Sequence, residues 1–261
     1  MTENIRIFIK TYPKDFFWLE LLLRSIEKYV SGFCGITIVC DRGKRIPQKT
    51  LNYITKLPIQ VIYLDLPLEK PKSTKPHLKG YIWQQFVKLN WWNYCNENYC
   101  MQVDSDCIFK EKFTPQDLLH NNKFIWNFTF WKYKQIERTK WKVSTDKILR
   151  KNIQHHGMVG RTFLLTRYHT RKLIEYITEN KADFWSWQWM IDNDIGQLSE
   201  YCLYGGFIFD LIRHESENLY HHQIWKNIKD FHLSDIALKT TKHFSQDKNI
   251  KQKIEEFESY L

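Results

Sequence analysis

The sequence predicts an α/β fold in which a mixed, mostly parallel sheet is flanked by helices. Short apolar segments alternate with helical patterns from residue 5 to residue 103, as in chains built from strand–helix–strand units. Polar residues follow directly after three of these apolar segments, and ligands of open α/β sheets bind at the carboxyl ends of the strands. No linker-like segment divides the chain, so we expect residues 1–261 to form a single domain.

Strand patterns alternate with helix patterns in the first half of the chain. Isoleucine recurs at every second position in residues 5–9, and this alternation predicts the first strand. Apolar residues recur at helical spacing within residues 13–30, which predicts a long helix. The remaining elements expected in this half are strands at 35–40, 59–66 and 99–103, and helices at 47–57 and 79–94.

The second half of the chain is less regular. The pattern predicts a strand at 124–131, a helix at 167–179 and a helical segment at 181–200. Residues 201–209 are an apolar run with two glycines, which predicts a strand with a bend or a close backbone approach. We expect the polar tail after residue 215 to pack across the sheet.

The composition restricts the class of protein. The chain carries 39 basic and 29 acidic residues, a net charge of +10, but its lysines are spread along the sequence. A nucleic-acid-binding protein would show a concentrated basic face with interleaved aromatic residues, so nucleic acid is not an expected partner. A basic surface could, however, meet an anionic membrane as a peripheral contact.

Three features bear on location. The six cysteines show neither metal-site spacing nor a disulfide-dense pattern, which favours a reducing compartment. The first residues lack the layout of a signal peptide, and no apolar run reaches the roughly 20 residues of a membrane span. We therefore expect a cytoplasmic protein whose membrane contact, where it has one, is peripheral.

The segment "MQVDSDCIF", residues 101–109, ends a predicted strand in two carboxylates separated by one serine. In an extended chain Asp104 and Asp106 point to the same side and can converge on one cation. A polar turn that closes a strand would also use aspartate, and the same spacing recurs at Asp192 and Asp194. The second pair lies in a helical pattern, where residues two apart diverge, so only the first pair is a candidate metal site.

The chemistry of the pair indicates which ion it would bind. Carboxylate oxygens suit Mg²⁺ or Mn²⁺ better than zinc or copper. Such an ion, shared between carboxylates and a diphosphate, neutralises the charge that develops on a diphosphate leaving group. We therefore expect Mg²⁺ or Mn²⁺ as the cofactor.

Four segments in a fixed order resemble a known family. They are "GYIWQQFVKLNWW", "MQVDSDCIF", "HHGMV" and "SEYCLYGGF". With the polar residues after the first strand, they are similar to the GT-A fold (Rossmann-like) glycosyltransferases. Within these, they resemble glycosyltransferase-like proteins of bacteria and large viruses that are linked to surface glycan synthesis.

This resemblance implies a function. A sugar would be transferred from a nucleotide diphosphate sugar, with a UDP-sugar favoured, to a glycan acceptor in surface polysaccharide or glycoprotein glycan synthesis. Residues 1–109 would form the half that binds the nucleotide sugar, and residues 110–261 the half that binds the acceptor.

The resemblance also implies roles on the donor side. Thr11 and Tyr12 would line the base pocket, and Asp41 would contact the base or the ribose. Gln85 and Lys88 would face the donor from one helix, and the metal-binding segment would consist of Asp104, Ser105 and Asp106. Gln85 and Lys88 are three apart and so share a helix face, although an ordinary solvated face has the same spacing. Asp106 would be the main metal ligand, and Asp104 would contact the metal or the ribose.

The acceptor side is implied in the same way. It would contain His156, Tyr204 and Gly205. An inverting transferase also needs a carboxylate that takes the proton of the acceptor hydroxyl, whereas a retaining enzyme does not need one in the same place. Glu200 is the first candidate for this base and Asp194 the second, and His243 is the candidate for a late metal ligand. The ordinary alternatives are a surface charge at a helix end and surface histidines.

Three other functions compete with this one. A sugar nucleotidyltransferase would carry a glycine-rich phosphate loop after the first strand, and "KTYPKDFFW" has no glycine. A basic nucleic-acid-binding protein or two-metal nuclease would need the concentrated basic face that the sequence lacks. A glycan-binding protein that has lost catalysis would bind sugar without consuming a donor.

Overall fold

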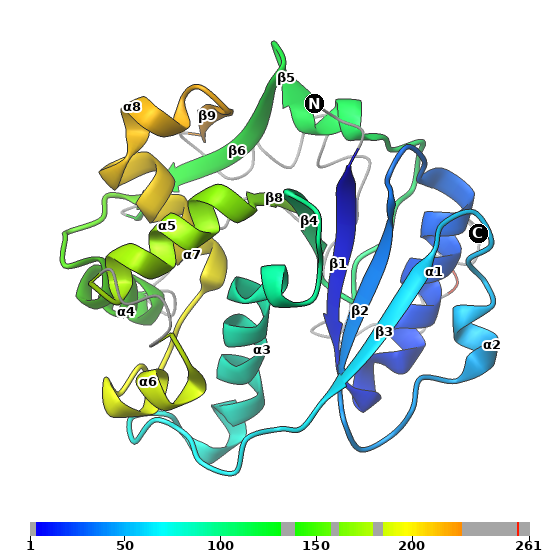
Figure 1. Ribbon diagram of the computed structural model, residues 1–261, viewed down its shortest axis with the longest axis horizontal. Coiled ribbons are helices and arrows are strands. Elements are labelled where there is room, and N and C mark those ends of the chain that lie inside the picture. The colour runs from blue at the N-terminus through cyan, green and yellow to red at the C-terminus, as the bar shows by residue number, and fades with distance from the viewer. Residues whose placement is uncertain (1–3, 132–138, 158–161, 180–184, 226–254, 256–261) are drawn as a thin grey trace.

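The computed structural model describes residues 4–131, 139–157, 162–179, 185–225 and 255. Its main sheet has five strands in the order β3-β2-β1-β4-β8 (Figure 1). The strands are β1 Ile5–Thr11, β2 Gly35–Asp41, β3 Ile59–Leu64, β4 Tyr99–Val103 and β8 Thr162–Thr166. The first four are mutually parallel, whereas β8 runs antiparallel to β4. The predicted mixed, mostly parallel sheet is confirmed.

Helices cover both faces of this sheet. In Figure 1, α1 and α2 lie on one side of β1–β3 and α3 lies on the other. The bounds are α1 Phe16–Tyr29, α2 Gln48–Leu51 and α3 Lys79–Leu89. α3 is shorter than predicted because Asn90 ends it and the chain turns into a short 3-10 helix, Trp91–Asn93.

A second sheet stands beside the first. It contains β5 Leu119–His120, β6 Lys123–Phe130 and β7 His155–His156, and β9 Tyr220–Trp225 pairs with β6 in parallel. The strand predicted at 124–131 is therefore confirmed. Of the tail after residue 215, the structure describes residues 216–225 and 255. Residues 220–225 form β9 in this second sheet instead of packing across the main sheet as predicted, and the prediction stays untested for the rest of the tail. The buried apolar side chains of both sheets belong to one continuous hydrophobic core.

The prediction of a strand at 201–209 is wrong. This segment forms helix α7, Glu200–Gly206, and continues into a π-helical turn, Phe207–Leu211. The hydroxyl of Ser199 caps α7 by accepting the backbone N–H of Cys202 at 3.3 Å. A continuous apolar run fits a buried strand or a buried helix equally well, and here every residue of α7 is buried. The close approach expected at the glycines does occur, since a Cβ on Gly205 would lie 2.9 Å from Cα of Gly157.

The remaining helices are α4 Thr139–Leu149, α5 Arg167–Ile177, α6 Trp187–Asp192 and α8 Arg213–Ser216. The helix predicted at 167–179 is confirmed by α5. α6 is shorter than the helical segment predicted at 181–200, because the chain leaves the helix at Asn193 and turns at Asp194, whose φ is 50°. Within the described residues, no helix is long and apolar enough to cross a membrane.

Candidate functional site

The candidate site lies where β1, β2 and β4 end. These strands are neighbours and run in the same direction, so the residues at their carboxyl ends meet at one edge of the sheet. The surroundings of Tyr12, which follows β1, show that these strand ends lie close together. Burial and the nearby carboxylates of Asp15, Asp106 and Asp41 raise the pKa of its phenol to about 12. The structure therefore brings together residues that the sequence predicted to share one site.

Lys88 is the centre of the site. It sits in the last turn of α3 with a side chain that is only 3% exposed, and its ammonium group contacts Oδ1 of Asp104. The same ammonium lies 2.9 Å from Oε1 of Glu200, in an ion pair, and 4.8 Å from the ring centre of Tyr201. Burial alone would lower the pKa of Lys88, but Asp104 and Glu200 raise it well above its ordinary value. Lys88 is therefore a fixed, buried positive charge.

Glu200 is buried rather than placed at the surface. Its side chain is 1% exposed, and burial raises the pKa of its carboxyl group while Lys88 opposes that rise. The backbone N–H of Glu200 donates to Oε1 of Gln85 at 3.2 Å. Gln85 and Lys88, one turn apart on α3, thus face α7 together, which confirms their shared face and excludes the solvated-face alternative.

A second buried lysine was missed in the sequence. Lys10, in β1, is 2% exposed and places its ammonium 2.6 Å from Oδ1 of Asp41. Burial lowers the pKa of Lys10, and Asp41 opposes that change. The indole N–H of Trp83, from α3, donates to the same oxygen at 3.2 Å. The available signal was the strand itself, because a lysine inside a central strand must find a partner when it is buried.

Asp15 is a further site residue that sequence reasoning treated only as a helix start. Its side chain does not cap α1. Instead, Ser105 donates its hydroxyl to Oδ2 of Asp15 at 3.0 Å. Burial, followed by the neighbouring charges of Asp106 and Asp104, raises the pKa of Asp15. Asp15 therefore ties the segment after β4 to the segment after β1, and it adds a further carboxylate beside Asp104 and Asp106.

The site supplies some, but not all, of the ligands that Mg²⁺ or Mn²⁺ would need. Asp104 and Asp106 offer hard carboxylate oxygens, and Lys88 already contacts one oxygen of Asp104. Over the ranges that the structure describes, no three His, Cys, Asp or Glu side chains converge as a metal site. Because Mg²⁺ is often held by one or two carboxylates together with substrate phosphates, these residues suit an ion that arrives with a phosphate ligand. His243 lies outside the described residues.

The residues predicted to contact the acceptor are buried. His156, on β7, is fully buried, and its ring centre lies 4.5 Å from that of Trp131. The hydroxyl of Tyr204 accepts the backbone N–H of Thr166 at 3.1 Å and lies 2.8 Å from the hydroxyl of Tyr220. With Gly205 packed on Gly157, these three residues join α7 to the second sheet and β8.

The second Asp-x-Asp pattern is divided between two structural roles. Asp192, at the end of α6, is exposed and accepts a hydrogen bond from Nε2 of Gln188 at 2.7 Å. Asp194 accepts the backbone N–H of Ser73 at 2.7 Å and so fixes the loop that follows β3. The two side chains thus have different neighbours, in agreement with the prediction that they do not chelate one ion together.

Comparison with known proteins identifies a family that matches this chain. Residues 5–258 match the model of a family described as "Family of unknown function (DUF6492)". No curated protein matches the sequence. Among solved structures, the apo form of mouse xyloside xylosyltransferase 1 is similar, with 11% sequence identity, 84% of each chain covered and a TM-score of 0.46.

Proposed function

The chain belongs to the DUF6492 family, and we propose that it is a glycosyltransferase that uses a nucleotide diphosphate sugar as its donor. The observation that carries this proposal is the buried contact between Lys88 and Asp104 at the end of β4. The segment after β4 is a turn rather than the extended chain that the sequence predicted, since the backbone N–H of Cys107 donates to the carbonyl of Asp104 at 3.1 Å. A polar turn alone, however, does not require a buried ammonium group beside it. A metal-dependent diphosphate site combines fixed positive charge with carboxylates for a metal ion at one place.

Asp41 would recognise the nucleoside. Both hydrogen bonds that the structure gives to this carboxylate, from Lys10 and Trp83, go to Oδ1. Oδ2 would accept a hydrogen bond from the ligand, either from a ribose hydroxyl or from a base N–H such as that of uracil. Every nucleotide carries such donors, so this contact supports a nucleoside as the ligand, and the preference for a UDP-sugar rests on the resemblance to the glycosyltransferases. Tyr12, which is 37% exposed just after β1, would complete the wall of the base pocket, and the fully buried Thr11 would support it from behind.

Asp106, with Asp104 beside it, would hold Mg²⁺ or Mn²⁺ together with the phosphate oxygens of the donor. When bound, such an ion supplies positive charge to the leaving diphosphate. Ser105 connects this segment to Asp15 through its 3.0 Å hydrogen bond, which would hold the Asp-x-Asp segment in place.

Glu200 would act as a positioning residue. Its side chain is almost fully buried and its carboxylate is paired with Lys88, so it is poorly placed to take a proton from an acceptor in solution. Its contribution would be to keep Lys88 charged and directed at Asp104. Asp194 would act through the loop after β3, which it fixes through Ser73.

The test is thermal stability against a panel of nucleoside diphosphates and their sugars, with and without Mn²⁺. A ligand that binds only the folded protein raises the melting temperature by mass action. We expect UDP or a UDP-sugar to raise it in a metal-dependent way. The proposal would be contradicted if no nucleotide in the panel raised the melting temperature.

The matched variants are Asp106→Asn and Asp192→Asn. Both remove one carboxylate from an Asp-x-Asp pattern, but only Asp106 lies at the candidate site. The metal-dependent shift should vanish in Asp106→Asn and remain in Asp192→Asn.

A further inference from the structure

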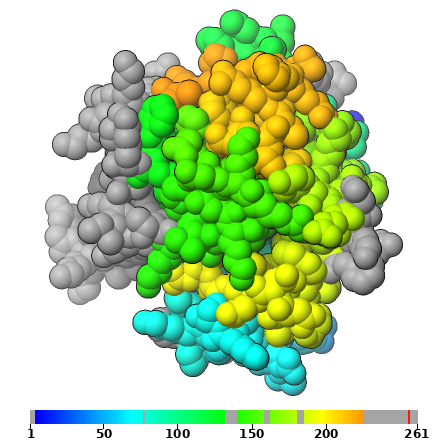
Figure 2. All heavy atoms as spheres, turned by 90° about the vertical axis from the view of Figure 1, so that its left-hand side faces the viewer, coloured from blue at the N-terminus to red at the C-terminus, as the bar shows by residue number. Residues whose placement is uncertain are grey.

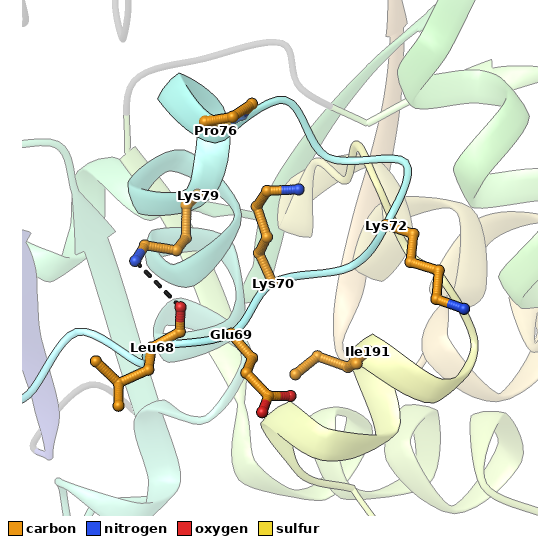
Figure 3. Close-up of a pocket in the computed structure, with 7 residues that line it drawn as sticks. All are labelled: Leu68, Glu69, Lys70, Lys72, Pro76, Lys79 and Ile191. Atoms are coloured by element: carbon orange, nitrogen blue, oxygen red, sulfur yellow. Dashed lines mark hydrogen bonds between the residues drawn. The ribbon is translucent and has the colours of Figure 1, made fainter.

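A cavity lies beside the start of α3, and its lining residues are not those of the candidate donor site. It has a volume of about 440 Å³ and lies between the loop after β3 and helix α6. Figure 3 shows its lining: Leu68, Glu69, Lys70, Lys72, Pro76, Lys79 and Ile191. Figure 2 shows the same neighbourhood from outside, with the loop after β3 in cyan against the yellow segment that contains α6.

The loop that forms one wall is held in place by three contacts from the α6 region. The backbone N–H of Ser73 donates to Asp194 at 2.7 Å, and the hydroxyl of Thr74 donates to the carbonyl of Gly196 at 3.0 Å. The indole N–H of Trp187 donates to the carbonyl of Glu69 at 3.1 Å. The cavity is therefore built by fixed walls that come from distant parts of the sequence.

The close approach at Gly196 fixes the same wall. A Cβ on this glycine would lie 2.0 Å from Oγ of Ser73, so the loop can approach the turn after α6 this closely only because no side chain is present.

Positive charge dominates the lining. Three of its seven residues are lysines and one is a glutamate. Lys70 and Lys79 are half-buried, and within the described part of the chain neither forms an ion pair. Their ammonium groups make only long contacts with backbone carbonyls, Lys70 with Pro71 at 3.4 Å and Lys79 with Leu68 at 3.5 Å. Two half-buried charges that are compensated this weakly favour an anionic ligand.

The first turn of α3 strengthens this preference. Lys79 is the first residue of α3, and no side chain caps the helix at Leu78. The positive end of the helix dipole therefore lies at the cavity. Leu68, Pro76 and Ile191 supply apolar surface beside the charges.

We propose that this cavity binds a phosphate-type anion carried by the acceptor substrate. The identification of the carrier as the acceptor rests on the proposed function. Lys79 and Lys88 are nine residues apart on α3, which places them about 14 Å apart along the helix axis. The cavity is therefore separate from the donor diphosphate site, at a distance that a phosphorylated glycan can span. The phosphate belongs either to a soluble acceptor or to a lipid headgroup.

The experiment measures binding of inorganic phosphate by calorimetry in the absence of divalent metal. The full chain is compared with the double variant Lys70→Gln/Lys79→Gln. Because charged hydrogen bonds are lost, we expect the variant to bind phosphate roughly tenfold more weakly. The control is Lys49→Gln/Lys112→Gln, which removes two exposed lysines elsewhere and should bind like the unaltered protein.

A second arm measures co-sedimentation with phosphatidylcholine vesicles that contain or lack phosphatidylglycerol. A loss of vesicle binding confined to the cavity variant assigns the phosphate to a lipid headgroup, and a loss confined to inorganic phosphate assigns it to a soluble acceptor. Equal binding by the cavity variant and the control in both arms would overturn the proposal. Neither arm uses nucleotide or metal, so failure here is distinct from failure of the donor site.

Discussion

The ammonium group of Lys88 lies 2.9 Å from Oε1 of Glu200, and both side chains are almost fully buried. Removing one member of a buried ion pair leaves its partner as an uncompensated charge in a medium of low polarity. We expect Lys88→Met to lower the free energy of unfolding by about 3 kcal/mol or more at neutral pH. Urea denaturation measures this loss, and a change below about 1 kcal/mol would contradict the pairing.

A second substitution tests whether Glu200 is the carboxylate that is left without a counter-ion in Lys88→Met. In the Lys88→Met background, Glu200→Gln removes the charge that has lost its counter-ion. This double variant should recover part of the lost stability, whereas Glu200→Gln in the unaltered protein should not stabilise it. Strict additivity of the two substitutions would show that the residues do not interact.

The indole of Trp83 tests the role assigned to Asp41. Trp83→Phe removes the N–H that donates to Oδ1 of Asp41, while a phenyl ring can still stack on Phe86. The loss of one such hydrogen bond should weaken nucleotide binding about fivefold. Because Trp83 is a buried core residue, its smaller replacement should also lower the free energy of unfolding by about 1 kcal/mol or more. Titration calorimetry with UDP measures the affinity. The matched control is Trp126→Phe, which likewise loses a buried indole N–H, here donated to the carbonyl of Gly157 at 3.1 Å in the second sheet, and should leave the affinity for UDP unchanged.

The carboxyl group of Asp15 gives a prediction for pH. Its pKa in the fold is raised above the ordinary value of 3.8, chiefly by burial and then by Asp106. A raised pKa means that the protonated form stabilises the fold; this stability is complete below the unfolded pKa and is lost as the pH rises through the folded pKa. Asp15→Asn should therefore gain stability relative to the unaltered protein as the pH rises from about 3.8.

Urea denaturation at a series of pH values tests this sign. Asn keeps an oxygen that can accept the hydroxyl of Ser105, so the packing of the variant should be preserved. A stability difference that moves in favour of the unaltered protein with rising pH would contradict the environment described for Asp15.

The sheet and the site edge could be predicted because their signals are local. The alternation in residues 5–9 and the apolar runs that follow specified β1, β2, β3 and β4, and strand direction then placed Asp41, Asp104 and Asp106 at one edge. The spacing of Gln85 and Lys88 likewise gave their common helix face, because that spacing is a property of the helix alone.

The remaining features depend on contacts that local patterns do not encode. The run 201–209 has no period that separates a buried strand from a buried helix, and its helical form follows from packing against β7 and α4. The burial of Glu200 depends on α7 lying against α3, which no spacing in the sequence reveals. Lys10 was the one missed residue with a local signal, since it stands in a strand that is otherwise apolar.

The measurement that tests the central claim most directly is the consumption of a donor. The protein is incubated with a panel of UDP-sugars and Mn²⁺, with water or added oligosaccharides as acceptor, and the UDP released is quantified by mass spectrometry. We predict metal-dependent release from at least one UDP-sugar, reduced on the order of a hundredfold in Asp106→Asn, because that variant loses charge stabilisation of the leaving diphosphate. Equal release by Asp106→Asn, or binding of a UDP-sugar that is never consumed, would contradict the account.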